Sequence, residues 1–137
     1  MASRIELHLP SNMEYLGVPD AVLMEIGSDM ECSKNDLEEL GTSVIEACTN
    51  AMEHGNGMEE AVEVEVHMDF GDGGIQVTVF DHGPGFDYDN WQPPTDVMRE
   101  RGRGILIMRE FADSLVYERA SDGRFLVRLI KHLTNSD

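Results

Sequence analysis

The stretch EACTNAMEHGN, residues 46–56, combines strong helix formers with a polar side chain at every fourth position: Glu46, Asn50 and His54. Asparagine is poorly suited to a helix interior, because its side-chain amide competes with the backbone for hydrogen bonds. Residues four apart lie on the same face of a helix, so the three side chains form one polar stripe. Such a stripe alone is also typical of a helix face that is exposed to solvent.

The other side of this helix is apolar. Five residues at helical spacing are predicted to face a sheet: Leu37, Leu40, Val44, Cys48 and Ala51. Ser33 or Asn35 can cap the start of the helix, and Gly55 is expected to stop it after His54.

The remaining patterns predict an α+β fold. Alternating apolar and polar residues indicate strands at 4–9, 61–70 and 75–80, and two final strands in SLVYER and GRFLVRLIKHL. Helices are predicted at 12–30, with an irregularity near Gly17 and Pro19, and from Gly104 in GILIMREFAD. We therefore expect a single domain, 1–137, with a mixed or antiparallel sheet of about five strands and three helices on one face.

Charge excludes some classes of partner. Ten Lys and Arg against 27 Asp and Glu give a net charge of −17, which repels nucleic acid. No apolar run reaches the roughly 18 residues of a membrane span, and the N-terminus lacks the apolar segment of a secretory signal. We expect a cytoplasmic protein without membrane contact, in which Cys32 and Cys48 are free thiols.

The basic residues are concentrated near the C-terminus. No Lys or Arg lies between Lys34 and Arg99, and eight of the ten lie from Arg99 onward. A phosphate group bound by the first two thirds of the chain must be neutralised by a metal ion, by backbone dipoles or by arginines of the last third.

The segment DHGPG, residues 81–85, follows the predicted strand 75–80. The strand brings Asp81 to its end, where the carboxylate can accept a hydrogen bond from an exocyclic amine. Gly83 and Gly85 would let a flat ring approach the backbone. A polar turn after a strand is the simpler alternative for this segment alone.

A second glycine-rich segment, RGRG at 101–104, precedes the third predicted helix. Backbone N–H groups at Gly102 and Gly104, together with the helix dipole, can hold phosphate oxygens. Arg99, Arg101 and Arg103 surround them and form the densest basic cluster of the chain.

In order and spacing, EACTN, DHGPG and GRG resemble the N, G1 and G2 boxes (ExxxN, DxGxG, GxG) of the GHKL or Bergerat-fold ATP-binding superfamily. The resemblance covers nearly the whole chain. With TNAMEHG at residues 49–55, the chain is most similar to the RsbW-like serine-protein kinases, the anti-sigma factors of bacterial partner switching.

The resemblance implies roles for individual residues. Asn50 would ligate Mg²⁺, Asp81 would accept the adenine amine, and Glu46 would activate a serine hydroxyl as general base. The other implied nucleotide-binding residues are His54, Gly83, Gly85, Phe86, Arg101, Gly102, Arg103, Gly104 and Ile105.

The resemblance also implies a function. ATP or ADP would bind with Mg²⁺ beneath a lid at about 86–103, and the γ-phosphate would pass to a serine of a STAS-type anti-anti-sigma protein. A sigma factor or another effector would be the second partner, and a homodimer is expected. A nucleotide-dependent binding module without kinase activity is the alternative. Two departures stand out: no basic residue lies in 12–30, and Phe125 and Leu126 stand where the family often has a threonine.

Overall fold

The computed structural model of the 137-residue chain describes residues 3–30, 33–93 and 100–132. Its elements, in order, are β1 Ser3–Leu9, the 3-10 turn η1 Met13–Tyr15, α1 Gly17–Ser28, α2 Lys34–Asn50, the π-helical turn η2 Ala51–Gly55, β2 Val64–Gly71, β3 Gly74–Asp81, α3 Glu100–Phe111, β4 Ser114–Arg119 and β5 Phe125–His132. No helix among these elements is both long and apolar enough to cross a bilayer.

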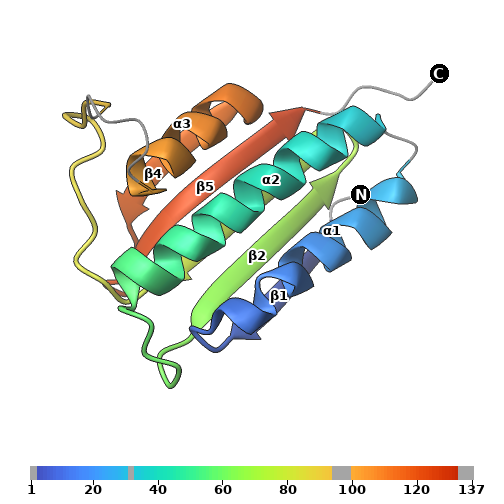
Figure 1. Cartoon of the computed structure of the whole chain (residues 1–137). Coiled ribbons are helices and arrows are strands. Elements are labelled where there is room, and N and C mark those ends of the chain that lie inside the picture. Colours follow the sequence, from blue (N-terminus) through green and yellow to red (C-terminus); the bar gives the residue numbers. More distant parts are fainter. Residues whose placement is uncertain (1–2, 31–32, 94–99, 133–137) are drawn as a thin grey trace.

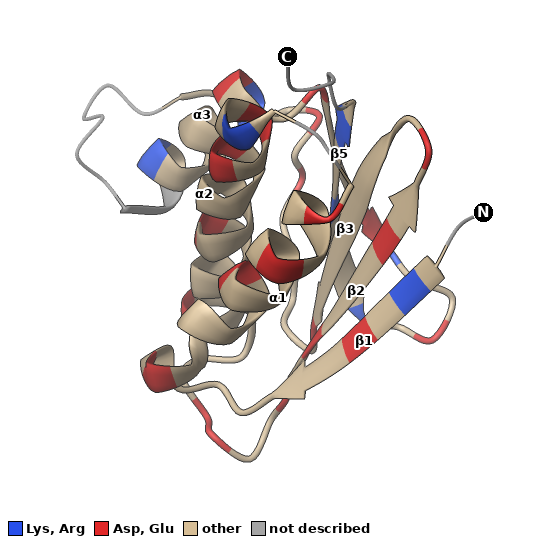
Figure 2. Cartoon of the chain, turned by 90° about the vertical axis from the view of Figure 1, so that its right-hand side faces the viewer, with Lys and Arg blue, Asp and Glu red and all other residues tan. Residues whose placement is uncertain are grey.

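The five strands form one sheet in the order β1-β2-β3-β5-β4, and all neighbouring strands are antiparallel. The three helices cover one face of this sheet, with α2 across its middle (Figures 1 and 2). The predicted α+β two-layer architecture is confirmed, and of the two sheet types expected the antiparallel one is present.

The core lies between the helices and the sheet. The buried strand residues on this side are Val64, Val66, Met68, Phe70, Ile75, Val77, Val79, Val127 and Leu129. The predicted apolar side of α2 is buried against them at all five positions, from Leu37 to Ala51. Each Val, Leu, Ile, Met or Phe side chain among them contributes about 1.5–3 kcal/mol when fully buried, so these two surfaces hold the layers together. Cys48 is free, and burial raises the pKa of its thiol to about 12.

The first predicted helix is interrupted where the sequence indicated. Asn12 accepts a hydrogen bond from the N–H of Glu14 and caps the short η1 turn, and α1 then begins at Gly17. Pro19 lies in the first turn of α1, where its missing N–H removes no helical hydrogen bond.

The second strand begins later than predicted. Residues 61–63 were expected to belong to it, but β2 starts at Val64, which pairs with Leu9, the last residue of β1. The backbone oxygens just before β2 accept hydrogen bonds from side chains instead. Ser11 Oγ donates to the Val62 oxygen at 2.5 Å, and Asn56 Nδ2 donates to the Glu63 oxygen at 3.2 Å. These bonds replace a strand ladder, so Val62 does not continue the buried row of β2.

The third helix begins earlier than predicted. It starts at Glu100 rather than Gly104, so Gly102 and Gly104 lie within its first turns and not in a loop before it. Glutamate and arginine are good helix formers, which explains how residues 100–103 join the helix. The predicted lid at about 86–103 falls partly on 94–99, which include Arg99 and lie outside the described residues.

Candidate functional site

The end of α2 is a π-helical turn. After Asn50 the chain continues through Ala51–Gly55 with i→i+5 hydrogen bonding, and the N–H of Asn56 reaches the Ala51 oxygen at 2.8 Å. π-helical turns are rare and occur often at functional sites. At Gly55 an added Cβ would lie 2.3 Å from Asp81 Cγ, so only glycine allows this turn to contact Asp81 so closely.

Asn56 connects this turn with the segment that follows β3. Its side chain is 7% exposed; Oδ1 accepts the N–H of His82 at 2.8 Å and Nδ2 donates to Ser11 Oγ at 3.0 Å. Since buried polar groups are costly unless they are hydrogen-bonded, this network holds His82, and hence its neighbour Asp81, in place. The motif comparison does not single out Asn56, although it closes the stretch EACTNAMEHGN.

Asp81 lies at the end of β3 and is buried. Its Oδ1 accepts the N–H of Gly83 at 2.8 Å, which tightens the turn after the strand. An added Cβ on Gly83 would lie 2.3 Å from the Gly55 oxygen, and one on Gly85, where φ is +68°, would lie 2.5 Å from the Phe125 ring. Both glycines of the DHGPG segment are therefore required by close packing.

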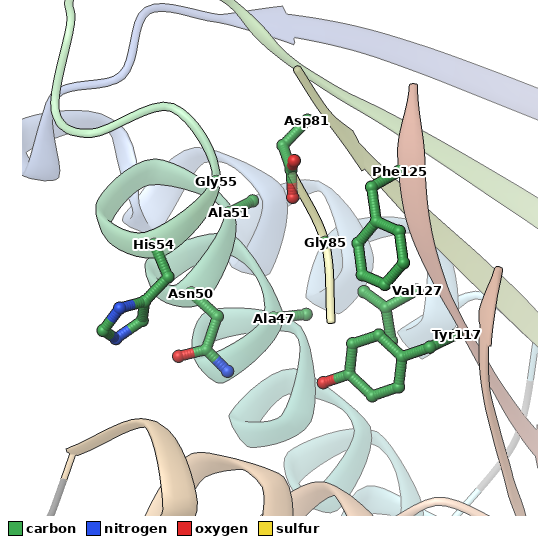
Figure 3. Close-up of a pocket in the computed structure, with 10 residues that line it drawn as sticks. All are labelled: Ala47, Asn50, Ala51, His54, Gly55, Asp81, Gly85, Tyr117, Phe125 and Val127. Atoms are coloured by element: carbon green, nitrogen blue, oxygen red, sulfur yellow. The ribbon is translucent and has the colours of Figure 1, made fainter. Parts of the chain in front are cut away.

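A small cavity opens beside Asp81. Figure 3 shows its lining residues: Ala47, Asn50, Ala51, His54, Gly55, Asp81, Gly85, Tyr117, Phe125 and Val127. Asn50 and the exposed His54 come from the helical side, and the rings of Phe125 and Tyr117 come from the strands opposite. The cavity measures about 20 Å³, room for about one water molecule. A ring-sized ligand enters only if Phe125, Tyr117 or the Gly85 segment moves.

Two aromatic residues of the cavity, Phe125 and Tyr117, lie outside the three sequence motifs, and strand pairing brings them to the cavity. Phe125 pairs with Asp81 across β3 and β5, and Tyr117 pairs with Val127 across β4 and β5. Arg119 then joins the β4–β5 hairpin to the DHGPG segment: it donates to the Gly83 oxygen at 3.2 Å. Local sequence carries no signal for this register.

Phe86 lies next to the cavity but does not line it. The ring packs edge-on against Tyr117 at 4.8 Å, in an aromatic cluster that also contains Tyr88, Trp91 and Phe125. The guanidinium of Arg109 from α3 lies 5.1 Å from the Trp91 ring, and its Nε donates to Tyr88 Oη at 2.8 Å. Phe86, Tyr88 and Trp91 are thereby packed against β4 and α3.

Glu46, Asn50 and Gly104 meet where α2 contacts α3. An added Cβ on Gly104 would lie 2.8 Å from Glu46 Oε2 and 3.5 Å from Asn50 Nδ2, so glycine permits the contact. Asn50 Nδ2 is buried, and none of the described residues offers it a hydrogen-bond partner. A buried polar atom of this kind is rare and marks a position where a ligand or water can bind.

Glu46 is a partly buried carboxyl group. Its burial raises the pKa, the positive charge of Arg103 opposes this shift, and the negative charge of Glu53 adds to it. A carboxylate with a raised pKa is a stronger proton acceptor than an ordinary glutamate, which suits a general base. The carboxamide oxygen of Asn50, one turn away, is a ligand type that Mg²⁺ accepts. A proton acceptor and a potential metal-ligand oxygen thus lie one helical turn apart.

The other predicted residues on α3 have different surroundings. Gly102 is buried in the first turn, and Arg103 is exposed. The Ile105 side chain is fully buried in the core, so any ligand contact of this residue is restricted to its backbone. The side chain of Arg101 lies outside the described part of the chain.

Comparison with known proteins identifies the family. Residues 9–131 match the family model described as histidine kinase-like ATPase domain. The serine-protein kinase RsbW of Bacillus velezensis is 32% identical over 138 aligned positions, covering 94% of this chain and 85% of that protein. RsbW of Bacillus subtilis is 31% identical over 123 positions, covering 83% and 77%. The chain belongs to the histidine kinase-like ATPase domain family and, within it, to the RsbW serine-protein kinases.

Solved structures agree with the fold. The SiaB–SiaC complex from Pseudomonas aeruginosa includes a chain that matches with a TM-score of 0.68 at 14% identity, over 92% of this chain and 88% of that one. The RsbU and RsbW domains of Rv1364c from Mycobacterium tuberculosis match with a TM-score of 0.67 at 16% identity, over 98% of this chain and 33% of that one. At these identities the likeness supports the architecture alone.

Proposed function

We propose that this protein is a Mg²⁺- and ATP-dependent serine-protein kinase of a partner-switching system, which phosphorylates a serine of a STAS-type antagonist protein. The observation that carries the proposal is the meeting of Glu46, Asn50 and Gly104 beside the cavity, where the buried Asn50 Nδ2 has no hydrogen-bond partner among the described residues. The names of the RsbW relatives support serine as the acceptor.

Asp81 and its glycines would hold the base. A carboxylate has about four lone-pair sites, so Asp81 can accept the adenine amine while it also accepts the N–H of Gly83. Movement of Phe125 or Tyr117 would widen the cavity, and either ring could then lie against the adenine. The base would therefore bind by induced fit.

The phosphates would lie near the N-terminus of α3. The first four N–H groups of a helix have no intrahelical partner, and α3 begins at Glu100, so the N–H of Gly102 is one of them. Arg103 lies close enough to act on the charge of Glu46. Asn50 would hold Mg²⁺, which supplies positive charge on the α2 side of the phosphates, where no Lys or Arg follows Lys34 in the helix.

Glu46 would act on the acceptor. Its carboxylate would take the proton of the partner's serine hydroxyl as the oxygen attacks the γ-phosphorus, the bond from that phosphorus to the β,γ-bridging oxygen breaks and ADP leaves. The raised pKa makes Glu46 a better base for this step. Asn50 and Glu46 would thus divide the work: one holds the metal ion and the other moves the proton.

The decisive experiment is a phosphotransfer assay. The protein is incubated with Mg²⁺, ATP and candidate STAS-type partners, and phosphoserine is measured by mass spectrometry. Glu46→Gln should lower the transfer rate about 10²- to 10⁴-fold and leave ATP affinity nearly unchanged. Glu38→Gln, on an exposed part of the same helix, is the matched control and should transfer normally. Transfer by Glu46→Gln at the wild-type rate would contradict the assigned base.

A nucleotide-dependent binding module without kinase activity is the second candidate. It is favoured by the narrow cavity, because opening the cavity would move residues next to the exposed Pro84 and next to the β4–β5 hairpin, which Arg119 joins to Gly83 and Pro84. This candidate predicts that a partner dissociates when the nucleotide is exchanged and that no phosphoserine forms. Absence of ATP binding in calorimetry would contradict both candidates.

We also propose that the protein has a sigma factor or another effector as a further partner, that it forms a homodimer, and that it is located in the cytoplasm.

A further inference from the structure

The face of the sheet opposite the helices carries a cluster of imidazole and carboxylate groups. Figure 2 shows that α1, α2 and α3 all lie on the other side of the sheet. On neighbouring strands Glu6 of β1 pairs with His67 of β2, and His8 of β1 pairs with Glu65 of β2. Alternation along each strand points all four side chains to this outer face. Two histidines and two glutamates therefore form a two-by-two array.

Three of these side chains converge on one point. His67 Nε2 is in close contact with Glu65 Oε2 and lies 3.8 Å from Glu6 Oε1. The potential ligand atoms of Glu6, Glu65 and His67 all lie within 4.8 Å of one another. His8 Nδ1 lies 3.5 Å from the other oxygen of Glu65. One imidazole nitrogen thus faces two carboxylates, an arrangement that an imidazolium ion or a bound metal ion would satisfy.

Neighbouring side chains hold the two inner residues in place. Arg124 Nη1 donates to Glu65 Oε1 at 3.1 Å, and its guanidinium lies 4.2 Å from the centroid of the Phe80 ring. The His67 ring packs against the same Phe80 ring, with 4.8 Å between the two ring centroids. Glu65 is thereby oriented with Oε2 toward His67, and the two side chains are only 18% and 13% exposed. Metal-ligating carboxylates are usually hydrogen-bonded themselves, as Glu65 is to Arg124.

We propose that Glu6, Glu65 and His67 bind a divalent transition-metal ion, with Zn²⁺ as the best match and water in the fourth position. Imidazole nitrogen with carboxylate oxygens is a ligand set for Zn²⁺, whereas Mg²⁺ and Ca²⁺ prefer oxygen alone. The ion would bind the lone pair of His67 Nε2 and lie between the imidazole and the two carboxylates. The net charge of −17 favours cations at the surface.

The site would lie outside the nucleotide cavity and would not depend on the proposed kinase activity. Glu6 comes from β1, which lies at the edge of the sheet beside β2 in the part of the chain that the structure describes, and the other two ligands come from β2. A bound ion would therefore join the edge strand to the sheet and stabilise the folded chain by preferential binding to it.

The test is a calorimetric titration of the chelator-treated, nucleotide-free protein with Zn²⁺. A Cys32→Ser background removes the thiol that lies outside the described residues, and Cys48 is fully buried. We expect one saturable ion per chain and a rise in Tm with Zn²⁺. His67→Ala should weaken Zn²⁺ binding at least about tenfold. The exposed Glu6→Gln should act in the same direction, and it keeps the test valid if His67→Ala folds poorly.

The matched control is His132→Ala, which removes an exposed imidazole on β5 of the same sheet and should leave Zn²⁺ affinity unchanged. A second readout is the ¹⁵N chemical shift of the His67 ring, which should move on Zn²⁺ addition as Nε2 is metallated. No saturable binding, or equal affinity of the wild type and Glu6→Gln, would overturn the site and leave an ion-paired imidazole as its explanation.

Discussion

The two faces of the sheet are built from the same strands but have different chemistry. Facing the helices, Val66, Met68 and Leu129 are fully buried or nearly so and make up much of the core. On the outer face the same strands contribute ion pairs, such as Arg4 with Asp69 and Arg128 with Glu118, each at 2.7 Å. Neighbouring residues of a strand point to opposite faces. The apolar side chains that stabilise the core and the charged side chains of the outer face therefore alternate along each strand.

The difference matters for function as well. The proposed nucleotide site lies at the end of the covered face, where the helices and the ends of β3, β4 and β5 meet, and its shape depends on tight packing at Gly55, Gly83 and Gly104. The outer-face groups are partly exposed and interact mostly through charge. Exposed ion pairs contribute about 0–1 kcal/mol each, so the outer face can change its charges with little effect on the fold.

The largest expected effect is a difference in unfolding free energy between substitutions at two adjacent positions of β5, Leu129 and Arg128. Leu129→Ala should lower the free energy of unfolding by about 2–5 kcal/mol, because it leaves a cavity in the core. Arg128→Ala, one residue earlier on the outer face, should cost at most about 1 kcal/mol. Urea denaturation of the two variants measures both values. Similar losses for the two would mean that the outer face is covered in solution, and the contrast between the faces would not hold.

A smaller effect is expected at the end of the sheet. Gly83→Ala should lower stability by about 1–3 kcal/mol through steric overlap, and it should weaken ATP binding, because its Cβ would lie 2.3 Å from the Gly55 oxygen. Gly73→Ala, in the β2–β3 turn with no atom within 4 Å of its Cβ, is the control and should be tolerated. Thermal melting with and without ATP checks both variants. Normal ATP affinity of Gly83→Ala would show that the DHGPG segment does not shape the site.

The smallest effect concerns Glu46, a carboxyl group at the α2–α3 contact whose pKa is raised by burial. Burial raises the folded-state pKa of Glu46 above its ordinary value, so ionisation of this group destabilises the folded protein at neutral pH. Glu46→Gln should therefore raise Tm at neutral pH while it slows phosphotransfer about 10²- to 10⁴-fold. As pH falls through the folded-state pKa, wild-type Glu46 becomes protonated and the difference in Tm should shrink. A variant less stable than wild type at neutral pH would contradict a burial cost at this position.

Much of the fold and the site followed from local patterns. The apolar stripe of α2 and the alternation of β2 and β3 predicted which side chains face the core, because helical and strand periods act over a few residues. The positions of Glu46, Asn50 and Asp81 on their elements were predicted in the same way, and the structure brings them to one region. Element ends were less predictable: β2 begins after residues 61–63 because Ser11 and Asn56 occupy their carbonyls.

The sequence alone determined the three motifs, their order, the faces of α2 and the uneven charge, all of which depend on residue type and short spacing. Only the tertiary structure decided that Phe125 pairs with Asp81, that Gly104 packs on Glu46, and that Glu6 pairs with His67. Each of these contacts joins residues far apart in the chain. Their register is set by the packing of the whole sheet and its helices, and no short segment encodes it.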